Sequence, residues 1–229
     1  MVEEEGTGSG LAAADLPGSA ANATEAGARG HAAQGDADGD RWVFAYGSLM
    51  WNPGFAFAER CEAQLVGAHR SLCIYSFHHR GTPEKPGLVL GLDLGGSCRG
   101  IAYRVAAAEW PQTHAYLIAR EQISGVYREV VRRLQLRDGS GRVVPAVAYI
   151  ANRGHVQYAR GLSRDDQLHL VRRSHGKSGP NGDYVLATVA ALETLGITDG
   201  DLSWIARHLH QEHALPHDAP SGEDETPPV

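Results

Sequence analysis

The chain has 229 residues, of which 42% are hydrophobic and 21% charged, the ordinary balance of a globular protein with one sizeable core. No apolar run approaches the roughly 18 residues that span a bilayer, and Glu3, Glu4 and Glu5 stand where a signal peptide carries basic residues, so we expect a cytoplasmic protein without a membrane anchor. Its three cysteines are widely spaced and form no CxxC pair, which argues against a disulfide framework and a zinc site.

The net charge of −6 is unevenly distributed along the chain. Residues 1–40 carry −7 and residues 214–229 carry −4, which leaves +5 for residues 41–213. Both ends hold few large apolar side chains, so we expect disordered acidic tails around a single domain at 41–213. The mildly basic domain suits an anionic small-molecule substrate, but it has no concentrated basic stripe of the kind that binds nucleic acid.

The first predicted strand, residues 42–46, ends in a tight turn with the sequence Tyr46-Gly47-Ser48-Leu49. Gly47 has no Cβ, so the backbone can turn sharply there and present successive N–H groups to a carboxylate or phosphate. The same residues are also compatible with an ordinary turn at the end of a strand. The turn is therefore a candidate anion site, with its role open at this point.

The next predicted elements are a β-rich region at 64–75 and two short strands at 88–93 and 99–104. Between them, residues 78–87 contain two prolines and two glycines, which favour an irregular loop. This loop carries several charged side chains.

A helix is predicted at 107–122, and one of its faces carries a carboxylate. At a 3.6-residue period that face holds Trp110, His114, Leu117 and Glu121. If Glu121 points inward, its apolar neighbours raise the carboxyl pKa and make it suitable as a proton shuttle near neutral pH. In the alternative, Glu121 bends outward from the last turn and pairs with Arg120 or Arg128 as a solvated ion pair.

The rest of the chain is predicted to add a hairpin and three helices. Residues 126–136 and 143–151 are β-branched runs joined by a polar loop with glycines, as in a β-hairpin. Ser163 and Asp166 form a capping box that opens the first helix. The three helices are expected at 163–176, 183–195 and 201–210.

Spacing excludes several familiar catalytic and binding motifs. A nucleophile elbow around Ser48 needs glycine where Met50 stands, and a P-loop ending at Ser178 needs glycine where Val171 stands. Three histidines near the C-terminus lack convergent thiolates or carboxylates, which indicates a solvated or adventitious metal site at most: His208, His210 and His213. His78 and His79, in the proline-containing loop, are better candidates for contact with a ligand.

Together these segments resemble a known family. The motifs, in chain order, are YGSLMWNP at 46–53, HRGTPEKPG at 79–87, Arg120-Glu121, Gly125-Val126-Tyr127, ANR at 151–153 and SGPN at 178–181 with Tyr184. In that order and spacing they resemble the ChaC family of glutathione-specific γ-glutamylcyclotransferases, over residues 42–210. The YGSL turn is shared by the wider γ-glutamylcyclotransferase superfamily, whereas the RGTPEKPG loop is specific to this branch.

The resemblance implies a fold and an activity. The expected fold is an α+β domain built on a small mixed β-barrel with packed helices, and no metal or organic cofactor is expected. The expected reaction cleaves the γ-glutamyl bond of glutathione by intramolecular cyclisation, giving 5-oxo-L-proline and L-cysteinylglycine. Glu121 matches the family's catalytic glutamate, which moves a proton from the α-amino group that attacks the γ-carbonyl.

The resemblance also implies a set of substrate-binding residues: Ala45, Tyr46, Gly47, Ser48, Leu49, Arg80 and Tyr127. Arg80 is expected to complement the charge of the tripeptide. Val126 departs from the family's Gly-Gly-Tyr and narrows the expected site, so another γ-glutamyl peptide or amine is an alternative substrate. A non-catalytic module that binds an anion at the turn is the alternative outside enzymes. The sequence leaves the oligomeric state open.

Overall fold

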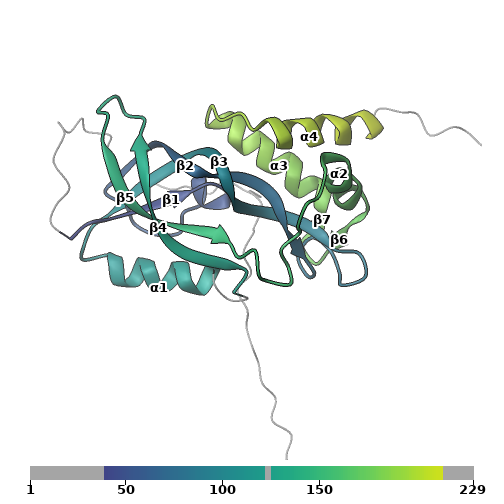
Figure 1. Ribbon diagram of the computed structural model, residues 1–229, viewed down its shortest axis with the longest axis horizontal. Coiled ribbons are helices and arrows are strands. Elements are labelled where there is room, and N and C mark those ends of the chain that lie inside the picture. The colour runs from purple at the N-terminus through teal and green to yellow at the C-terminus, as the bar shows by residue number, and fades with distance from the viewer. Residues whose placement is uncertain (1–38, 122–124, 214–229) are drawn as a thin grey trace, which may run out of the picture.

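The computed structural model describes residues 39–121 and 125–213. Two long strands, β2 (Glu59–Ser76) and β3 (Gly87–Val105), form the antiparallel ribbon on which the domain is built. Strand β1 (Arg41–Ala45) pairs antiparallel with β3 and parallel with β5 (Val143–Ala151). The result is a barrel with mixed strand directions, as expected from the sequence (Figure 1).

Strand β4 (Tyr127–Leu136) closes the barrel between β5 and β2. It pairs with β5 along nearly its whole length, but with β2 only at Ala63–Leu65, opposite residues 134–136. The closed order is β1-β3-β2-β4-β5. Because β4 pairs only with the first half of β2, the second half of β2 and the first half of β3 extend past the barrel and leave room for a site beside them.

The ribbon differs from the sequence prediction in one respect, because the two short strands expected at 88–93 and 99–104 are a single strand, β3. The glycines between them, Gly95 and Gly96, adopt φ values of +99° and +67°, and Gly67 on β2 adopts +93°. Glycine tolerates these left-handed conformations, so the ribbon bends at a register shift and pairing continues beyond it. The sequence prediction placed a loop between two strands where the structure has a bulge within one strand.

The helices cover two sides of the barrel (Figure 1). Helix α1 (Trp110–Glu121) lies on one side, and α2 (Arg164–Arg173), α3 (Asn181–Thr194) and α4 (Gly200–His213) pack together on the other. The predicted capping box is present at α2, where the Ser163 hydroxyl accepts from the Asp166 N–H at 3.1 Å and the Asp166 carboxylate accepts from the Ser163 N–H at 3.0 Å.

Two short elements were not predicted from the sequence. A single 3-10 turn, η1 (Ser48–Met50), follows β1, and a two-residue hairpin is formed by β6 (His175–Gly176) and β7 (Gly179–Pro180). Elements this short leave no periodic pattern to detect. No helix in the described part of the chain has the length and apolar character needed to cross a bilayer.

The predicted acidic tails lie outside the described residues except for the last two residues of the first one. There, the Asp40 carboxylate accepts from the Arg104 guanidinium at 2.7 Å and from the Ala107 N–H at 3.0 Å. These bonds tie the start of β1 to the segment that leads into α1. Asp40 is therefore hydrogen-bonded to the domain that was predicted to begin at residue 41.

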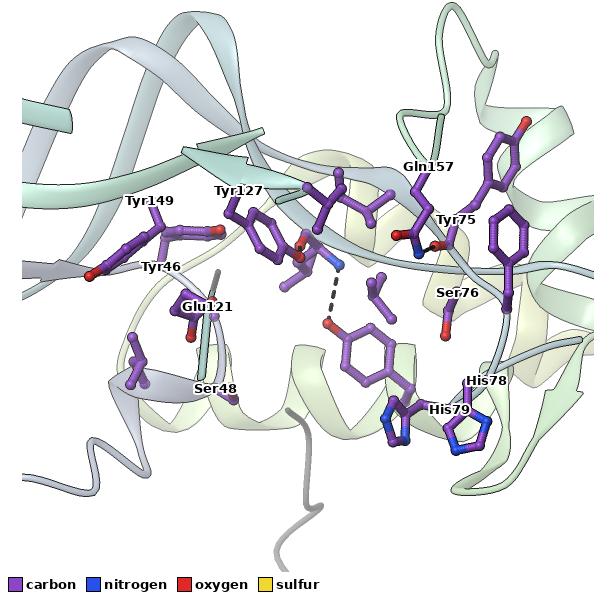
Figure 2. A pocket seen from close by; sticks show the side chains of 18 of the residues that line it. Tyr46, Ser48, Tyr75, Ser76, His78, His79, Glu121, Tyr127, Tyr149 and Gln157 are labelled. Atoms are coloured by element: carbon purple, nitrogen blue, oxygen red, sulfur yellow. Dashed lines mark hydrogen bonds between the residues drawn. The ribbon is translucent and has the colours of Figure 1, made fainter. Parts of the chain in front are cut away.

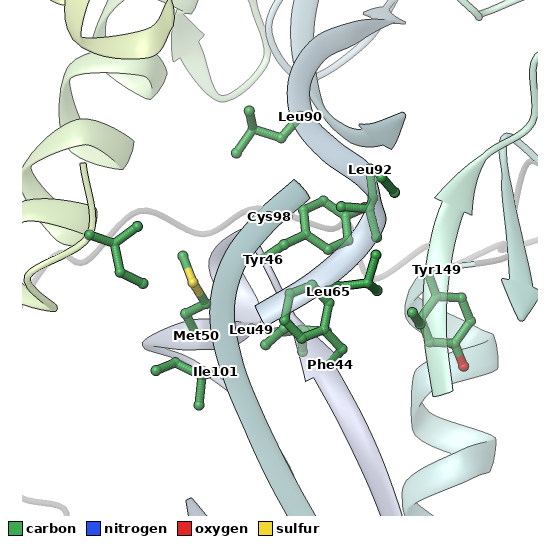
Figure 3. Close-up of a cluster of buried hydrophobic side chains, with 14 of the residues drawn as sticks. Phe44, Tyr46, Leu49, Met50, Leu65, Leu90, Leu92, Cys98, Ile101 and Tyr149 are labelled. Atoms are coloured by element: carbon green, nitrogen blue, oxygen red, sulfur yellow. The ribbon is translucent and has the colours of Figure 1, made fainter. Parts of the chain in front are cut away.

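Apolar side chains fill the barrel interior. Figure 3 shows Phe44 from β1 close to Leu65 from β2, and both are essentially unexposed. Ile101 from β3 is equally buried but lies beside Met50, on the other face of the sheet. Helix α1 adds Leu117, which is also fully buried. Since the interior is packed, a ligand site has to lie at an end of the barrel and not in its lumen.

The edge of β3 beyond the barrel is hydrogen-bonded by side chains in place of another strand. The Asn181 amide, at the start of α3, accepts from the Leu88 N–H at 2.6 Å and donates to the Leu88 carbonyl at 2.8 Å. At Leu90, the N–H donates to the Tyr184 hydroxyl at 3.2 Å and the carbonyl accepts from the Tyr127 hydroxyl at 2.6 Å. Buried backbone N–H and C=O groups need hydrogen-bond partners, and these side chains supply them along the edge of β3. The edge can therefore line a cavity without a neighbouring strand.

Candidate active site

A cavity of about 240 Å³ lies at the end of the barrel where β1 runs into its turn, beside the extended part of the β2–β3 ribbon (Figure 2). Segments far apart in the sequence supply its wall. The lining residues are Phe44, Tyr46, Gly47, Ser48, Leu49, Ile74, Tyr75, Ser76, Phe77, His78, His79, Val89, Leu90, Glu121, Val126, Tyr127, Tyr149, Gln157 and Tyr184. Six of the eight residues predicted for the site are among them.

The turn after β1 presents backbone N–H groups to this cavity. The N–H groups of Ser48 and Leu49 have no hydrogen-bond acceptor within residues 39–121 and 125–213, and both residues line the cavity. The buried Arg70 side chain fixes the start of the turn by donating to the Tyr46 carbonyl at 2.5 Å, and it is itself held by Asp199 at 3.1 Å. The turn is thus rigidly supported and has donors available for an anion.

Glu121, the last residue of α1 that the structure describes, points into the same cavity. Its side chain is only 14% exposed. Burial raises the pKa of its carboxyl group, and the neighbouring Arg120 guanidinium offsets part of that rise. Both sequence interpretations hold in part: the carboxylate faces inward, and it also pairs with Arg120, whose Nε lies 3.2 Å from its Oε1.

Arg120 connects the carboxylate to the turn. Its guanidinium donates to the Ser48 hydroxyl at 2.7 Å and to the Tyr116 hydroxyl at 2.7 Å, while its Nε faces Glu121. One rigid fork therefore fixes the distance between the acid–base candidate and the N–H-bearing turn. Sequence reasoning treated Arg120 only as a competing partner of Glu121, because its contact with Ser48 joins residues 72 positions apart.

Tyrosines form much of the wall near Glu121. Burial raises the pKa values of Tyr46 and Tyr127 well above the usual value, and that of Tyr184 is raised for the same reason. These phenols are therefore neutral and cannot serve as bases. Because Tyr127 donates to the Leu90 carbonyl, it supports the site through its ring and through this bond.

The structure does not place two of the predicted substrate-binding residues at the cavity. Ala45 is fully buried in β1, and Arg80 is 1% exposed. The Arg80 guanidinium donates to the carbonyls of Ser178 and Pro180, at 2.5 and 3.4 Å, and lies over the Tyr184 ring with 5.4 Å to its centroid. Arg80 thus holds the β6–β7 hairpin against the loop. The sequence suggested a ligand contact because Arg80 is a charged residue in a polar loop. The carbonyls that bind it lie in a distant segment, so no local pattern pointed to them.

A separate cluster of Glu59, Cys61 and Asp138 brings together atoms of the kind that bind metals. However, the Arg142 guanidinium donates to Glu59 at 2.5 Å and to Asp138 at 2.8 Å. Burial also raises the pKa of the Cys61 thiol to about 11, which keeps it protonated. The cluster is an ion-pair network around an arginine and does not have the donor chemistry of a cation site.

The fold and the cavity agree with comparisons to known proteins. The family model described as ChaC-like protein matches residues 41–212, nearly the whole described domain. The chain belongs to the ChaC-like family. This confirms the resemblance inferred from the YGSL and RGTPEKPG motifs.

Relatives of this ChaC-like chain carry a common name. A protein from Escherichia coli strain K12 named glutathione-specific γ-glutamylcyclotransferase is 36% identical over 166 residues, covering 72% of this chain and 71% of that protein. Glutathione-specific γ-glutamylcyclotransferase 1 from Homo sapiens is 29% identical, covering 69% and 74%. A crystal structure of a γ-glutamyl cyclotransferase specific to glutathione from yeast superimposes with a TM-score of 0.67 at 22% identity, covering 76% and 97%, and confirms the fold.

Three parts of the ChaC-like site had no signal in the sequence. Tyr149 and Gln157 line the cavity but lie in ordinary apolar or loop segments. Arg70 supports the turn from β2, 24 positions away. Only the register of β2 against β3 and the closure of the barrel bring these residues to the turn, and neither follows from local patterns.

Proposed function

We propose that this chain cleaves glutathione by intramolecular cyclisation, forming 5-oxo-L-proline and L-cysteinylglycine without a metal or an organic cofactor. One observation carries the proposal: a buried carboxylate, Glu121, opens onto the same cavity as the unbonded N–H groups of Ser48 and Leu49. Membership of the ChaC-like family and the names of the relatives support the choice of substrate.

In this proposal the turn binds the γ-glutamyl head of the substrate. The N–H groups of Ser48 and Leu49 donate to its α-carboxylate, and Gly47 allows the backbone to approach closely. Tyr46 and Tyr127 close the site around the head. The α-amino group then lies on the side of Glu121, which Arg120 fixes relative to the turn.

The reaction needs one acid–base group. The Glu121 carboxylate takes a proton from the α-amino group as its nitrogen attacks the γ-carbonyl carbon, and a carbon–nitrogen bond closes the five-membered ring. The bond from that carbon to the cysteine nitrogen breaks, and Glu121 returns the proton to this nitrogen as cysteinylglycine leaves. No bond to the protein forms, which agrees with the missing nucleophile motif.

Positioning accounts for much of the expected rate. Amine and carbonyl belong to the same molecule, so holding them in a reactive pose replaces an encounter between separate reactants. The carboxylate supplies the proton transfer. The raised pKa of Glu121 brings its basicity closer to neutral pH, where a shuttle works best.

Incubation of the purified full chain with millimolar reduced glutathione tests the proposal. We expect 5-oxoproline and cysteinylglycine to form in equal amounts, as measured by chromatography. Parallel reactions with γ-glutamyl-alanine and γ-glutamyl amines test the alternative substrates suggested by Val126, which lines the cavity. Absence of 5-oxoproline from every substrate, together with saturable binding of glutathione, would identify a binding module and reject the enzyme.

A prediction on pH dependence concerns Arg120. Its removal in Arg120→Met takes away the cation that lowers the Glu121 pKa, while the burial that raises this pKa remains. The base works only as the carboxylate, so kcat/KM falls as the pH falls through the Glu121 pKa. We therefore expect the acidic limb of the profile to move to higher pH in Arg120→Met and to move less in Arg120→Lys. An unmoved limb in Arg120→Met would contradict this.

The proposal also covers the partners and the cellular location of the enzyme. Glutathione is its small-molecule partner, and we propose a cytoplasmic location with no nucleic acid or membrane partner. The +5 charge of residues 41–213 is diffuse and forms no concentrated basic stripe, which supports the absence of a nucleic acid partner.

A further inference from the structure

The cavity has two chemically different ends. Figure 2 shows Glu121 and Ser48 at one end and His78 and His79 at the other, with Tyr127 between them. The cavity lining also includes five aliphatic side chains: Leu49, Ile74, Val89, Leu90 and Val126. If the γ-glutamyl head occupies the Glu121 end, as the proposed function requires, the leaving part of the substrate extends toward the two histidines.

Charge distinguishes the histidine end. Among the described residues that line the cavity, only His78 and His79 have side chains that can carry a positive charge. An imidazole N–H donates well to a carboxylate, and more strongly when the ring is protonated. The two ring centroids lie 4.9 Å apart and the rings are nearly perpendicular, so a small group that contacted both would be approached from two directions.

The β6–β7 hairpin fixes the backbone of both histidines. The His78 carbonyl accepts from the Lys177 N–H at 2.8 Å, and the His79 carbonyl accepts from the Ser178 N–H at 2.9 Å. Nδ1 of His79 also lies 3.0 Å from the Ser178 hydroxyl. Gly176 packs so closely that a Cβ there would lie 2.5 Å from the His79 carbonyl oxygen. This end of the cavity is therefore held in place before a ligand arrives.

We infer that His78 and His79 bind the carboxylate of the leaving dipeptide, so that the cavity selects γ-glutamyl substrates whose leaving group ends in a free carboxylate. For glutathione this is the glycine carboxylate. The inference rests on the proposed function, and it identifies specificity-determining residues that take no part in the proton transfer. His78 is exposed at the mouth of the cavity and carries the sharper test, because His79 also contacts Ser178.

The experiment compares glutathione with its glycine monoethyl ester, which keeps every heavy atom of the tripeptide, removes the negative charge of the glycine carboxylate and adds an ethyl group. Steady-state constants for 5-oxoproline release are measured for the unmodified chain, His78→Ala, His78→Gln and the control His169→Ala, an exposed histidine on α2. We expect the unmodified chain to prefer the acid over the ester by about tenfold or more in kcat/KM. In His78→Ala this preference shrinks through a higher KM for the acid, while the ester is nearly unaffected.

The other variants complete the test. His78→Gln, which keeps an N–H donor but no charge, should lie between the unmodified chain and His78→Ala, and His169→Ala should keep the full preference. If the unmodified chain turns over acid and ester equally, or if His78→Ala and His78→Gln weaken both substrates to the same extent, the inference is wrong. If no substrate yields 5-oxoproline, the proposed function fails, and the inference falls with it.

Discussion

We expect Glu121→Gln to lower kcat for 5-oxoproline formation by at least ~100-fold, the lower end of what one positioned acid–base group contributes. Glutamine keeps the size of the side chain and an oxygen that can accept from Arg120, but it cannot take a proton from the α-amino group. Because binding uses the turn after β1, KM should change little. The variant should also fold normally, since burial disfavours the charged form of Glu121 in the first place.

Two other carboxylates serve as controls for Glu121. Glu109→Gln alters an exposed residue just before α1 and should leave turnover unchanged. Glu129 is the more demanding control, because its carboxylate accepts from the Tyr149 hydroxyl at 2.8 Å and Tyr149 lines the cavity. If Glu129→Gln lost as much turnover as Glu121→Gln, or if Glu121→Gln kept more than about a tenth of the turnover, the assigned proton shuttle would be wrong.

The elements of the fold followed from local patterns, and their assembly did not. Alternating and β-branched runs located the strands, and the Ser163 capping box located α2. The continuity of β3 was missed because Gly95 and Gly96 carry the signal of a turn but act as a bulge between paired halves. Pairing with β2 decides this, and pairing is a long-range property.

The same difference between local patterns and long-range contacts applies to the predicted site. The turn at residues 46–49 and Glu121 line one cavity, and each has a local signature, a glycine after an apolar strand and a carboxylate on a helix face. Those signatures left their roles open, and the resemblance to the family made them site candidates. Arg80 was predicted to meet the substrate, but backbone carbonyls from the β6–β7 hairpin bind it. Arg120 was seen only as a partner of Glu121, since its bond to Ser48 exists only in the folded chain.

The largest effect on stability is expected at Asn181, which is fully buried and hydrogen-bonds both backbone groups of Leu88. Asn181→Leu preserves the approximate size but leaves the Leu88 N–H and carbonyl unpaired in a dry environment. Each such group costs about 1–3 kcal/mol, so we expect the free energy of unfolding to fall by roughly 2–6 kcal/mol. Urea unfolding followed by tryptophan fluorescence measures this directly.

Glu193→Leu, an exposed polar-to-apolar change on the same helix, is the matched control and should alter stability by less than about 0.5 kcal/mol. Asn181→Asp separates lost hydrogen bonding from lost packing, because its carboxylate can still accept from the Leu88 N–H but faces the Leu88 carbonyl. Protonation lets that carboxyl group donate, and burial raises its pKa, so the destabilisation should grow as the pH rises through that value. If Asn181→Leu were as stable as the unmodified chain, the β3 edge would not depend on Asn181, and another group would have to pair with Leu88 beside the cavity.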